Sequence, residues 1–137
     1  MPVVIDTSVL VAGLMARRGA ASALVAAFFA DRLAVAYTAA ILSEYAEVLA
    51  RPEFGGVITP ADRMGVILKL RASGHLVKPV TVPDAAWPDR DDLPFVAAAL
   101  ATARKIIVTL NSRDFAPASD CGVRVLSPRQ ARVELLA

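Results

Sequence analysis

The chain has 137 residues, of which 56% are hydrophobic and 20% charged, and its formal net charge is +2. This length predicts one domain over residues 1–137, and the apolar content excludes a disordered chain. The single cysteine, Cys121, excludes an internal disulfide, and no apolar run reaches the roughly 20 residues that span a bilayer. We therefore expect a cytoplasmic protein that has no membrane partner.

Short Val- and Ile-rich runs alternate with longer Ala- and Leu-rich segments. We expect strands at about 2–6, 33–37, 77–82, 105–109 and 123–126, and helices near 8–15, 19–31, 39–51, 60–73, 92–103 and 128–135. The loops are expected at 51–56, 83–89 and 116–120. This order predicts an α/β protein, a three-layer α/β/α sandwich with a mostly parallel sheet of four to five strands. The run 77–82 is an edge strand or no strand, because Pro79 cannot donate to a ladder.

Asp6 ends the first apolar run and directly precedes a predicted helix. That position lies at the carboxyl edge of a buried parallel strand, where open α/β sheets bind ligands. The alternative is that Asp6 caps the helix, a common role for Asp at such a turn. Because Thr7 and Ser8 could cap the helix without a charge, the sequence favours a functional carboxylate.

The helix at 39–51 carries two glutamates on different faces, and Thr38 is its expected N-cap. At about 100° per residue, one buried stripe is formed by Ile41, Leu42, Tyr45, Val48 and Leu49. Glu44 lies at the border of that stripe, whereas Glu47 points away from it. Glu44 is therefore the candidate for a cleft, the alternative being a solvated charge on the flank of the helix.

Three acids, Asp89, Asp91 and Asp92, precede the helix at 92–103. Acids ahead of a helix with Pro94 in its first turn are often caps, but three exceed what a cap requires. We expect Asp92 to bind metal, with Asp89 as an alternative ligand and Asp91 facing solvent.

The fourth predicted strand continues into Thr109, Asn111 and Asp114. These groups reach Asp6 if the fourth strand lies beside the first one. Carboxylates that converge with no histidine beside them favour a divalent metal over acid–base work without metal. The only histidine, His75, follows a predicted helix and is expected to be structural.

The small positive charge permits nucleic-acid binding without requiring it, because affinity for phosphate depends on where basic residues cluster. The candidates for such a cluster are Arg17, Arg18, Arg51, Arg90, Arg104, Lys105 and Arg113. We expect most of them to be ordinary solvated charges. The high apolar content also favours an exposed face that a partner or a second copy covers, so a homodimer is expected.

Together these features resemble the PIN-domain nucleases, and more closely the toxin components of bacterial toxin–antitoxin systems. The resemblance rests on Asp6-Thr7-Ser8, on Ser43-Glu44-Tyr45, on Asp89 and Asp92 before Phe95-Val96, and on Val108-Thr109 with Asn111, Asp114 and Phe115. It implies an endoribonuclease dependent on Mg²⁺ or Mn²⁺, with RNA as substrate and an antitoxin protein as partner.

The resemblance also implies roles for individual residues. Catalysis and metal binding fall to Asp6, Glu44 and Asp92, with Asp89 or Asp114 as a fourth acid and Thr7, Thr109 and Asn111 in support. Relatives often carry an acid where Asn111 stands, and a neutral side chain there would weaken a second metal site.

Two other functions stay open. A PIN-like fold could bind RNA or protein without catalysis, since fold alone does not fix function. A phosphoryl-transfer α/β domain would also place Asp6 after the first strand, but phosphatases of the haloacid-dehalogenase type require a second Asp where Ser8 stands. Catalysis by a Ser/His/Asp triad has no local motif to support it.

Overall fold

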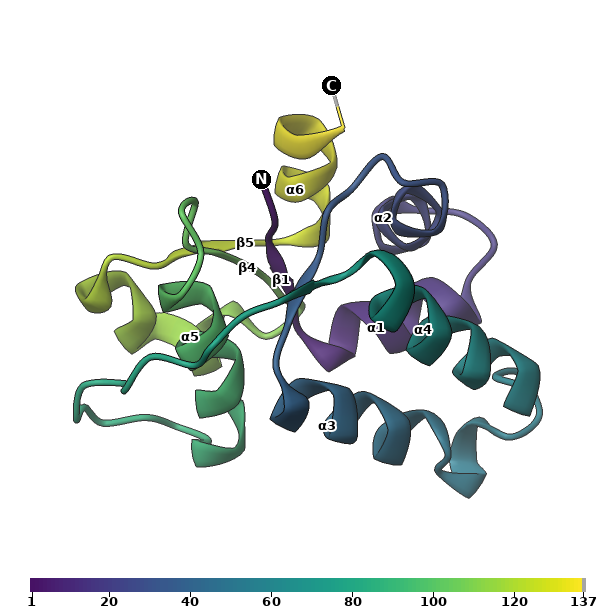
Figure 1. Cartoon of the computed structure of the whole chain (residues 1–137), viewed down its shortest axis with the longest axis horizontal. Coiled ribbons are helices and arrows are strands. Elements are labelled where there is room, and N and C mark those ends of the chain that lie inside the picture. Colours follow the sequence, from purple (N-terminus) through teal and green to yellow (C-terminus); the bar gives the residue numbers. More distant parts are fainter. Residues whose placement is uncertain (137) are drawn as a thin grey trace.

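The computed structural model describes residues 1–136 and alternates short strands with longer helices (Figure 1). The strands are β1 (Val4–Ile5), β2 (Ala36–Tyr37), β3 (His75–Leu76), β4 (Ile106–Val108) and β5 (Arg124–Leu126). The α-helices are α1 (Thr7–Met15), α2 (Ala20–Phe29), α3 (Ala39–Leu49), α4 (Pro60–Ser73), α5 (Leu93–Leu100) and α6 (Pro128–Leu135), and short 3-10 helices are η1 (Pro52–Phe54), η2 (Arg90–Asp92) and η3 (Ser112–Cys121). The six predicted helices are confirmed, with ends that shift by a few residues.

All strand pairings are parallel. β1 pairs with β4 and β4 with β5, while β2 pairs with β3. A single parallel bridge between Val3 and Val35 joins the two groups, so the strands follow the order β3-β2-β1-β4-β5. The predicted parallel sheet is therefore confirmed, although its strands are shorter than the apolar runs that predicted them.

Helices cover the sheet on both faces. In Figure 1, α5 and α6 lie on opposite sides of β4 and β5. Helix α2 contacts both α1 and α6, and α3 contacts both α4 and α5. The predicted three-layer α/β/α arrangement is confirmed, and a further contact between α1 and α3 sets up the cleft described below.

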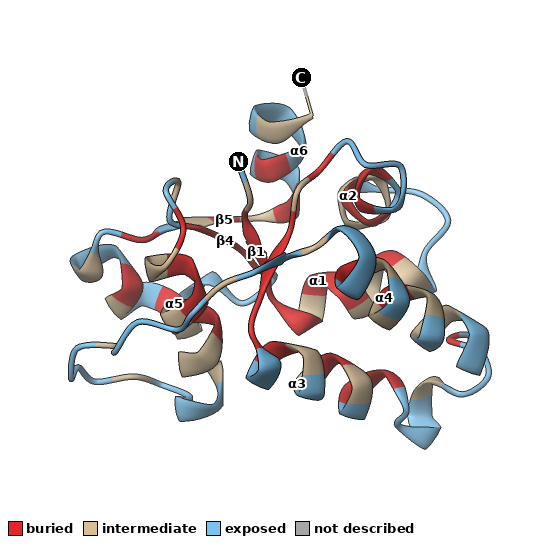
Figure 2. Cartoon of the chain, viewed as in Figure 1, coloured by how far each residue is buried: buried red, intermediate tan, exposed pale blue. Residues whose placement is uncertain are grey.

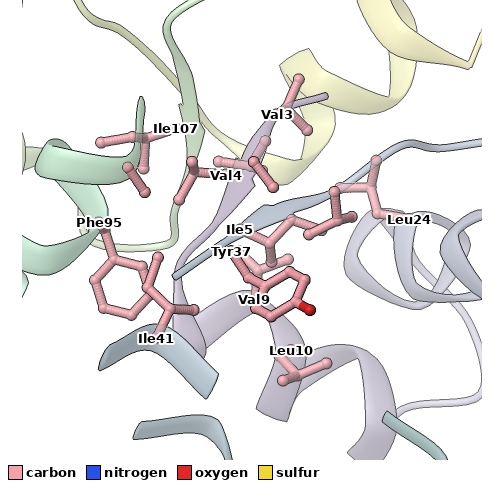
Figure 3. Close-up of a cluster of buried hydrophobic side chains, with 14 of the residues drawn as sticks. Val3, Val4, Ile5, Val9, Leu10, Leu24, Tyr37, Ile41, Phe95 and Ile107 are labelled. Carbon is pink, nitrogen blue, oxygen red and sulfur yellow. The ribbon is translucent and has the colours of Figure 1, made fainter. Parts of the chain in front are cut away.

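The core forms around β1, which is buried along its whole length (Figure 2). Figure 3 shows Val4 of β1 beside Ile107 of β4, its partner in the sheet register. Phe95 of α5 and Ile41 of α3 close the core from the helical side, and both are almost fully buried. A strand buried on both faces needs a continuous apolar run, which explains the sequence that precedes Asp6.

Helices α1 and α2 are both apolar, lie at 95° to each other and pack closely at Gly13. A Cβ atom placed on Gly13 would lie 2.7 Å from the carbonyl oxygen of Ala21 and would also overlap the side chain of Val25. Within residues 1–136 no single helix combines the length and apolar character needed to cross a membrane, and α1 with α2 meets those criteria only as a bent pair.

Helix α3 begins and packs as its sequence predicts. The hydroxyl of Thr38 accepts a hydrogen bond from the amide of Ile41 at 3.2 Å, so Thr38 is the N-cap. The predicted stripe faces the core, with Ile41, Tyr45, Val48 and Leu49 buried and Leu42 half-buried.

The structure decides between the two alternatives for 77–82 and shows that the loop expected at 116–120 is wrong. The run 77–82 forms no strand; the third strand is β3, which precedes it and pairs with β2. In place of a ladder, Val80 donates one hydrogen bond to the carbonyl of Ala97 at 3.0 Å, as expected next to Pro79, which has no amide proton. The predicted loop 116–120 lies within η3, which ends at Gly122 in a left-handed conformation with φ 85°.

Candidate active site

A cleft of about 610 Å³ opens at the carboxyl edge of β1 and β4. Its wall is formed by residues from α1, α3, the segment leading into α5 and the segment following β4. Six carboxylates line it: Asp6, Glu44, Asp89, Asp91, Asp92 and Asp114. Because β4 lies beside β1 in the sheet, the acids from both ends of the sequence reach the same cleft.

Asp6 is the most enclosed of these acids, with an exposed fraction of 5%. Its Oδ2 atom accepts hydrogen bonds from the hydroxyls of Ser8 and Thr109, each at 2.7 Å. Although Asp6 stands at the N-cap position of α1, its side chain makes no capping hydrogen bond. The capping alternative therefore fails, and the carboxylate is held by two hydroxyls beside the cleft.

Thr109 connects Asp6 to the segment after β4. It is 1% exposed, donates to Asp6 and accepts from the amide of Asn111 at 3.0 Å. The amide of Leu110 donates to the Ser8 hydroxyl at 3.2 Å. Two hydroxyls thus tie both sides of the β1–β4 edge to one carboxylate. The side chain of Asn111 is exposed and lines the cleft.

Glu44 reaches the cleft from α3. Its Oε2 atom accepts a hydrogen bond from the Thr7 hydroxyl at 2.6 Å, whereas Glu47 is exposed and does not line the cleft. The Tyr45 hydroxyl donates to the backbone carbonyl of Ile5, which fixes α3 against β1. Burial and the neighbouring Asp6 and Glu44 charges raise the pKa of Tyr45 far above its usual value, so the phenol stays protonated as a donor.

The acids before α5 have distinct environments. The Oδ1 atom of Asp89 accepts from the amide of Asp91 at 2.9 Å, so Asp89 caps η2 and also lines the cleft. Asp91 is exposed, as predicted, yet it too contributes to the cleft wall. Asp92 is half-buried.

Burial and the negative charges of the other acids raise the pKa of Asp92. Burial is the largest cause that raises its pKa from 3.8 to about 7, followed by the negative charges of Asp6, Asp89, Asp114 and Glu44. This repulsion shows that acids from four separate segments of the chain act on one another across the cleft.

The donor set suits a hard divalent cation. Across residues 1–136, no group of three or more His, Cys, Asp or Glu side chains is arranged to hold an ion directly. Mg²⁺, however, usually keeps several waters and needs only one or two direct carboxylates. The cleft supplies carboxylate, amide and hydroxyl oxygens alone, and a cation would relieve the repulsion that raises the Asp92 pKa. The residues therefore fit Mg²⁺ or Mn²⁺ chemically.

The structure gives two residues named in the sequence a place in the site. Ser8, considered above as a helix cap, instead donates to Asp6. Arg51, one of the candidates for a basic cluster, lines the cleft, and its spacing of seven residues from Glu44 on one helical face is the signal for that position. His75 lies on β3 and is not among the residues that line the cleft.

Comparison with known proteins assigns the sequence to a family. A family model described as PIN domain matches residues 2–113. That range contains Asp6, Glu44, Asp89 and Asp92 and ends one residue before Asp114. Neither the comparison with curated proteins nor the comparison with solved structures gave a match. PIN domains are generally nucleases, commonly metal-dependent ribonucleases.

Proposed function

Because the chain belongs to the PIN-domain family, we propose that it is a metal-dependent endoribonuclease whose active site is the acidic cleft at the end of β1. One observation carries the proposal: Asp6 is almost fully buried, held by two hydroxyls, and shares its cleft with five other carboxylates. Negative charges gathered without a cation destabilise a fold, so their presence points to function.

In this proposal Asp6, Glu44 and Asp92 hold Mg²⁺ or Mn²⁺, with Asp89 or Asp114 as a fourth acid. The bound ion would activate a water for attack on the phosphodiester and neutralise the charge that develops there. Both Asp89 and Asp114 line the cleft, which leaves the two candidates for the fourth acid equal in position.

The chain's own residues set the geometry of the acids. Ser8 and Thr109 both donate to the same oxygen of Asp6, which restricts rotation of that carboxylate. Thr7 does the same for Glu44. Fixed acids lose less freedom when the site is filled, and positioning of this kind is a large part of catalysis.

The same proposal makes this protein the toxin of a toxin–antitoxin pair that acts on cytoplasmic RNA as a homodimer. The support is the resemblance of its motifs to toxin components, together with exposed apolar side chains that a protein partner would cover. Met64 and Leu68 of α4 are 52% and 58% exposed, and Leu76 of β3 is 68% exposed. Light scattering of the purified chain checks the dimer, since a monomeric mass would remove that part of the proposal.

A non-catalytic PIN-like domain that only binds RNA or protein is the second candidate. The observation in its favour is that, among residues 1–136, no three acids are arranged to hold an ion directly. The buried, hydroxyl-bonded Asp6 favours the nuclease, because simple binding of an anionic RNA gains nothing from six carboxylates. The third possibility, phosphoryl transfer, has Ser8 hydrogen-bonded to Asp6 where a second acid is required.

Cleavage of labelled RNA in Mn²⁺ separates these candidates. We expect wild-type protein to cleave, and Asp6→Asn and Asp92→Asn to lose about 100-fold or more of that activity because each removes a charged ligand. Asp84→Asn is the matched control, since Asp84 is exposed and does not line the cleft. Equal cleavage by wild type and Asp92→Asn would exclude the proposed site.

A further inference from the structure

The acidic cleft continues as an apolar groove between α1 and α3. Beyond the acids, its wall is formed by Val11, Ala12 and Met15 of α1, Val48 of α3 and Phe54 of η1. Both helices leave the sheet edge in the same direction (Figure 1) and contact each other. The wall therefore changes from acidic to apolar along the direction of the helices.

Helix α3 places three kinds of side chain along this groove. Glu44, Val48 and Arg51 are separated by four and three residues, so they lie on one face of the helix and its C-terminal extension. At 1.5 Å per residue, about 6 Å separates Glu44 from Val48 along the axis and about 10 Å separates Glu44 from Arg51. All three line the cleft.

Helix α1 matches this order. The hydrogen bond between Thr7 and Glu44 aligns the starting points of the two helical faces. From Thr7, the positions four and eight residues further on are Val11 and Met15, which line the groove. The apolar side chains of α1 therefore run alongside Val48 toward Arg51.

Arg51 is a positive charge that stays unpaired beside many negative ones. Among residues 1–136 its guanidinium forms no salt bridge, although six carboxylates line the same cleft. Its backbone is held by a hydrogen bond from its amide to the carbonyl of Val48 at 3.1 Å and by one from the amide of Phe54 to its own carbonyl at 3.0 Å. The backbone of Arg51 is therefore held in place, and its exposed guanidinium is available to bind an anion such as phosphate in a bidentate manner.

We propose that this groove binds the nucleoside next to the cleaved bond of single-stranded RNA, with Arg51 on the following phosphate. The inference rests on the proposed function, which puts the cleaved phosphate at the acidic end. The groove then offers a phosphate position, an apolar stretch and a cation within about 10 Å, the order in which RNA presents phosphate, nucleoside and phosphate. A peptide has no such alternation built into its backbone.

The apolar stretch selects an unpaired base. Val11, Met15 and Phe54 offer apolar and aromatic surface, and bases bind such surfaces through their flat faces. In a duplex these faces are stacked on neighbouring bases, and proteins that read RNA bases mostly target single strands and loops for that reason. The groove therefore favours single-stranded RNA over a duplex of the same sequence.

Fluorescence anisotropy with a labelled single-stranded RNA in EDTA measures binding without cleavage. We expect Arg51→Gln to weaken binding about fivefold and to lower the salt slope by about 0.7, the contribution of one phosphate contact. Phe54→Leu keeps an apolar side chain but loses the ring face, so about threefold weaker binding is expected. Wild-type protein should bind the duplex at least about tenfold more weakly than the single strand.

Arg71→Gln is the control, because Arg71 is exposed on α4, does not line the cleft and loses the same charge. Thermal melting of each variant verifies that it folds. Equal affinities for Arg51→Gln and Arg71→Gln, or equal wild-type affinity for single strand and duplex, would overturn the inference. A groove that binds a peptide instead of RNA would also give equal affinities in these comparisons.

The outcome is separable from that of the proposed function. If Asp92-dependent cleavage occurs but Arg51→Gln changes neither Kd nor KM, the groove assignment fails and the nuclease stands. If no variant cleaves RNA but binding still depends on Arg51, the nuclease fails and the groove stands as a binding site.

Discussion

Asp6 is an almost fully buried side chain whose carboxylate is positioned by two hydroxyl groups. The two hydroxyls that hold it come from positions 8 and 109, so the arrangement depends on the β1–β4 pairing. Hydrogen bonds to a charged group contribute about 1.5–3 kcal/mol, more than neutral ones. At the scale of residues, hydroxyl groups hold Asp6 and Glu44, and a backbone amide holds Asp89.

Removing the Thr109 hydroxyl tests whether it positions the Asp6 carboxylate. Thr109→Val keeps the side-chain shape but removes the donor to Asp6, so we expect the free energy of unfolding to fall by about 1–2 kcal/mol and cleavage to drop about tenfold. Urea denaturation and RNA cleavage measure the two effects. Thr81→Val is the control, because Thr81 is exposed and does not line the cleft. Unchanged stability and activity in Thr109→Val would show that the hydroxyl does not position Asp6.

The raised pKa of Asp92 leads us to expect that the stability of the metal-free protein depends on pH. Its pKa is about 7 in the folded protein, whereas the unfolded chain has the usual 3.8. Below pH 3.8 both states are protonated and Asp92 has no effect; between pH 4 and 7 the folded state alone keeps the proton, so stability falls as pH rises and then levels off. Solvent screens a half-buried group, so the loss is on the order of 1–2 kcal/mol.

Denaturation in EDTA at pH 4 and pH 8 measures this loss. Asp92→Asn cannot ionise, so this variant should be more stable than wild type at pH 8, with the difference shrinking toward pH 4. Asp84→Asn should follow wild type at both values. A constant difference between Asp92→Asn and wild type across this range would contradict the assigned pKa.

At the scale of elements, the helices could be predicted from local patterns in the sequence, whereas the pairing of the strands could not. The helices follow from apolar periodicity and caps such as Thr38, which act within one segment. The run 77–82 predicts an edge strand or no strand, and the parallel pairing with β2 uses His75 and Leu76 instead. Pairing between distant segments leaves no local pattern, so a sequence cannot place such a short strand.

The site was likewise predictable only in part. Helical geometry distinguished Glu44 from Glu47, and the strand-end rule brought Asp6 and Thr109 to one edge. The fourth acid stayed undecided because Asp89 and Asp114 lie in short 3-10 segments or at their ends, where side-chain direction follows tertiary contacts. The apolar groove could not be predicted from the sequence, because it exists only where α1 contacts α3.

Close packing between α1 and α2 gives a prediction that runs against helix propensity. Ala is normally favoured over Gly in a helix by about 1 kcal/mol, yet Gly13→Ala should destabilise the protein by about 1–3 kcal/mol because the new methyl meets Ala21 and Val25. Gly65→Ala in α4 is the control: nothing lies within 4 Å of its Cβ, so stability should rise by up to about 1 kcal/mol. Urea denaturation compares the two, and a stabilised Gly13→Ala would show that α1 and α2 are not in close contact.

For the whole molecule, the parallel sheet brings distant parts of the chain to one edge. Acids from residue 6 to residue 114 line a single cleft, and the two helices that leave that edge extend it into a groove. The apolar core fixes β1 from both sides, so the acids at its end stand on a rigid support (Figure 3). The fold thereby brings six carboxylates and the guanidinium of Arg51 into one cleft.

The most direct test of a metal-binding active site at the end of β1 is a crystal structure of the protein soaked in Mn²⁺, with the ion located by its anomalous scattering. We expect a peak between the carboxylates of Asp6 and Asp92, at about 2.0–2.6 Å from their oxygens, and no peak in crystals of Asp6→Asn. A cleft without a peak at saturating Mn²⁺, or a peak bound only outside the cleft, would contradict the proposed metal site.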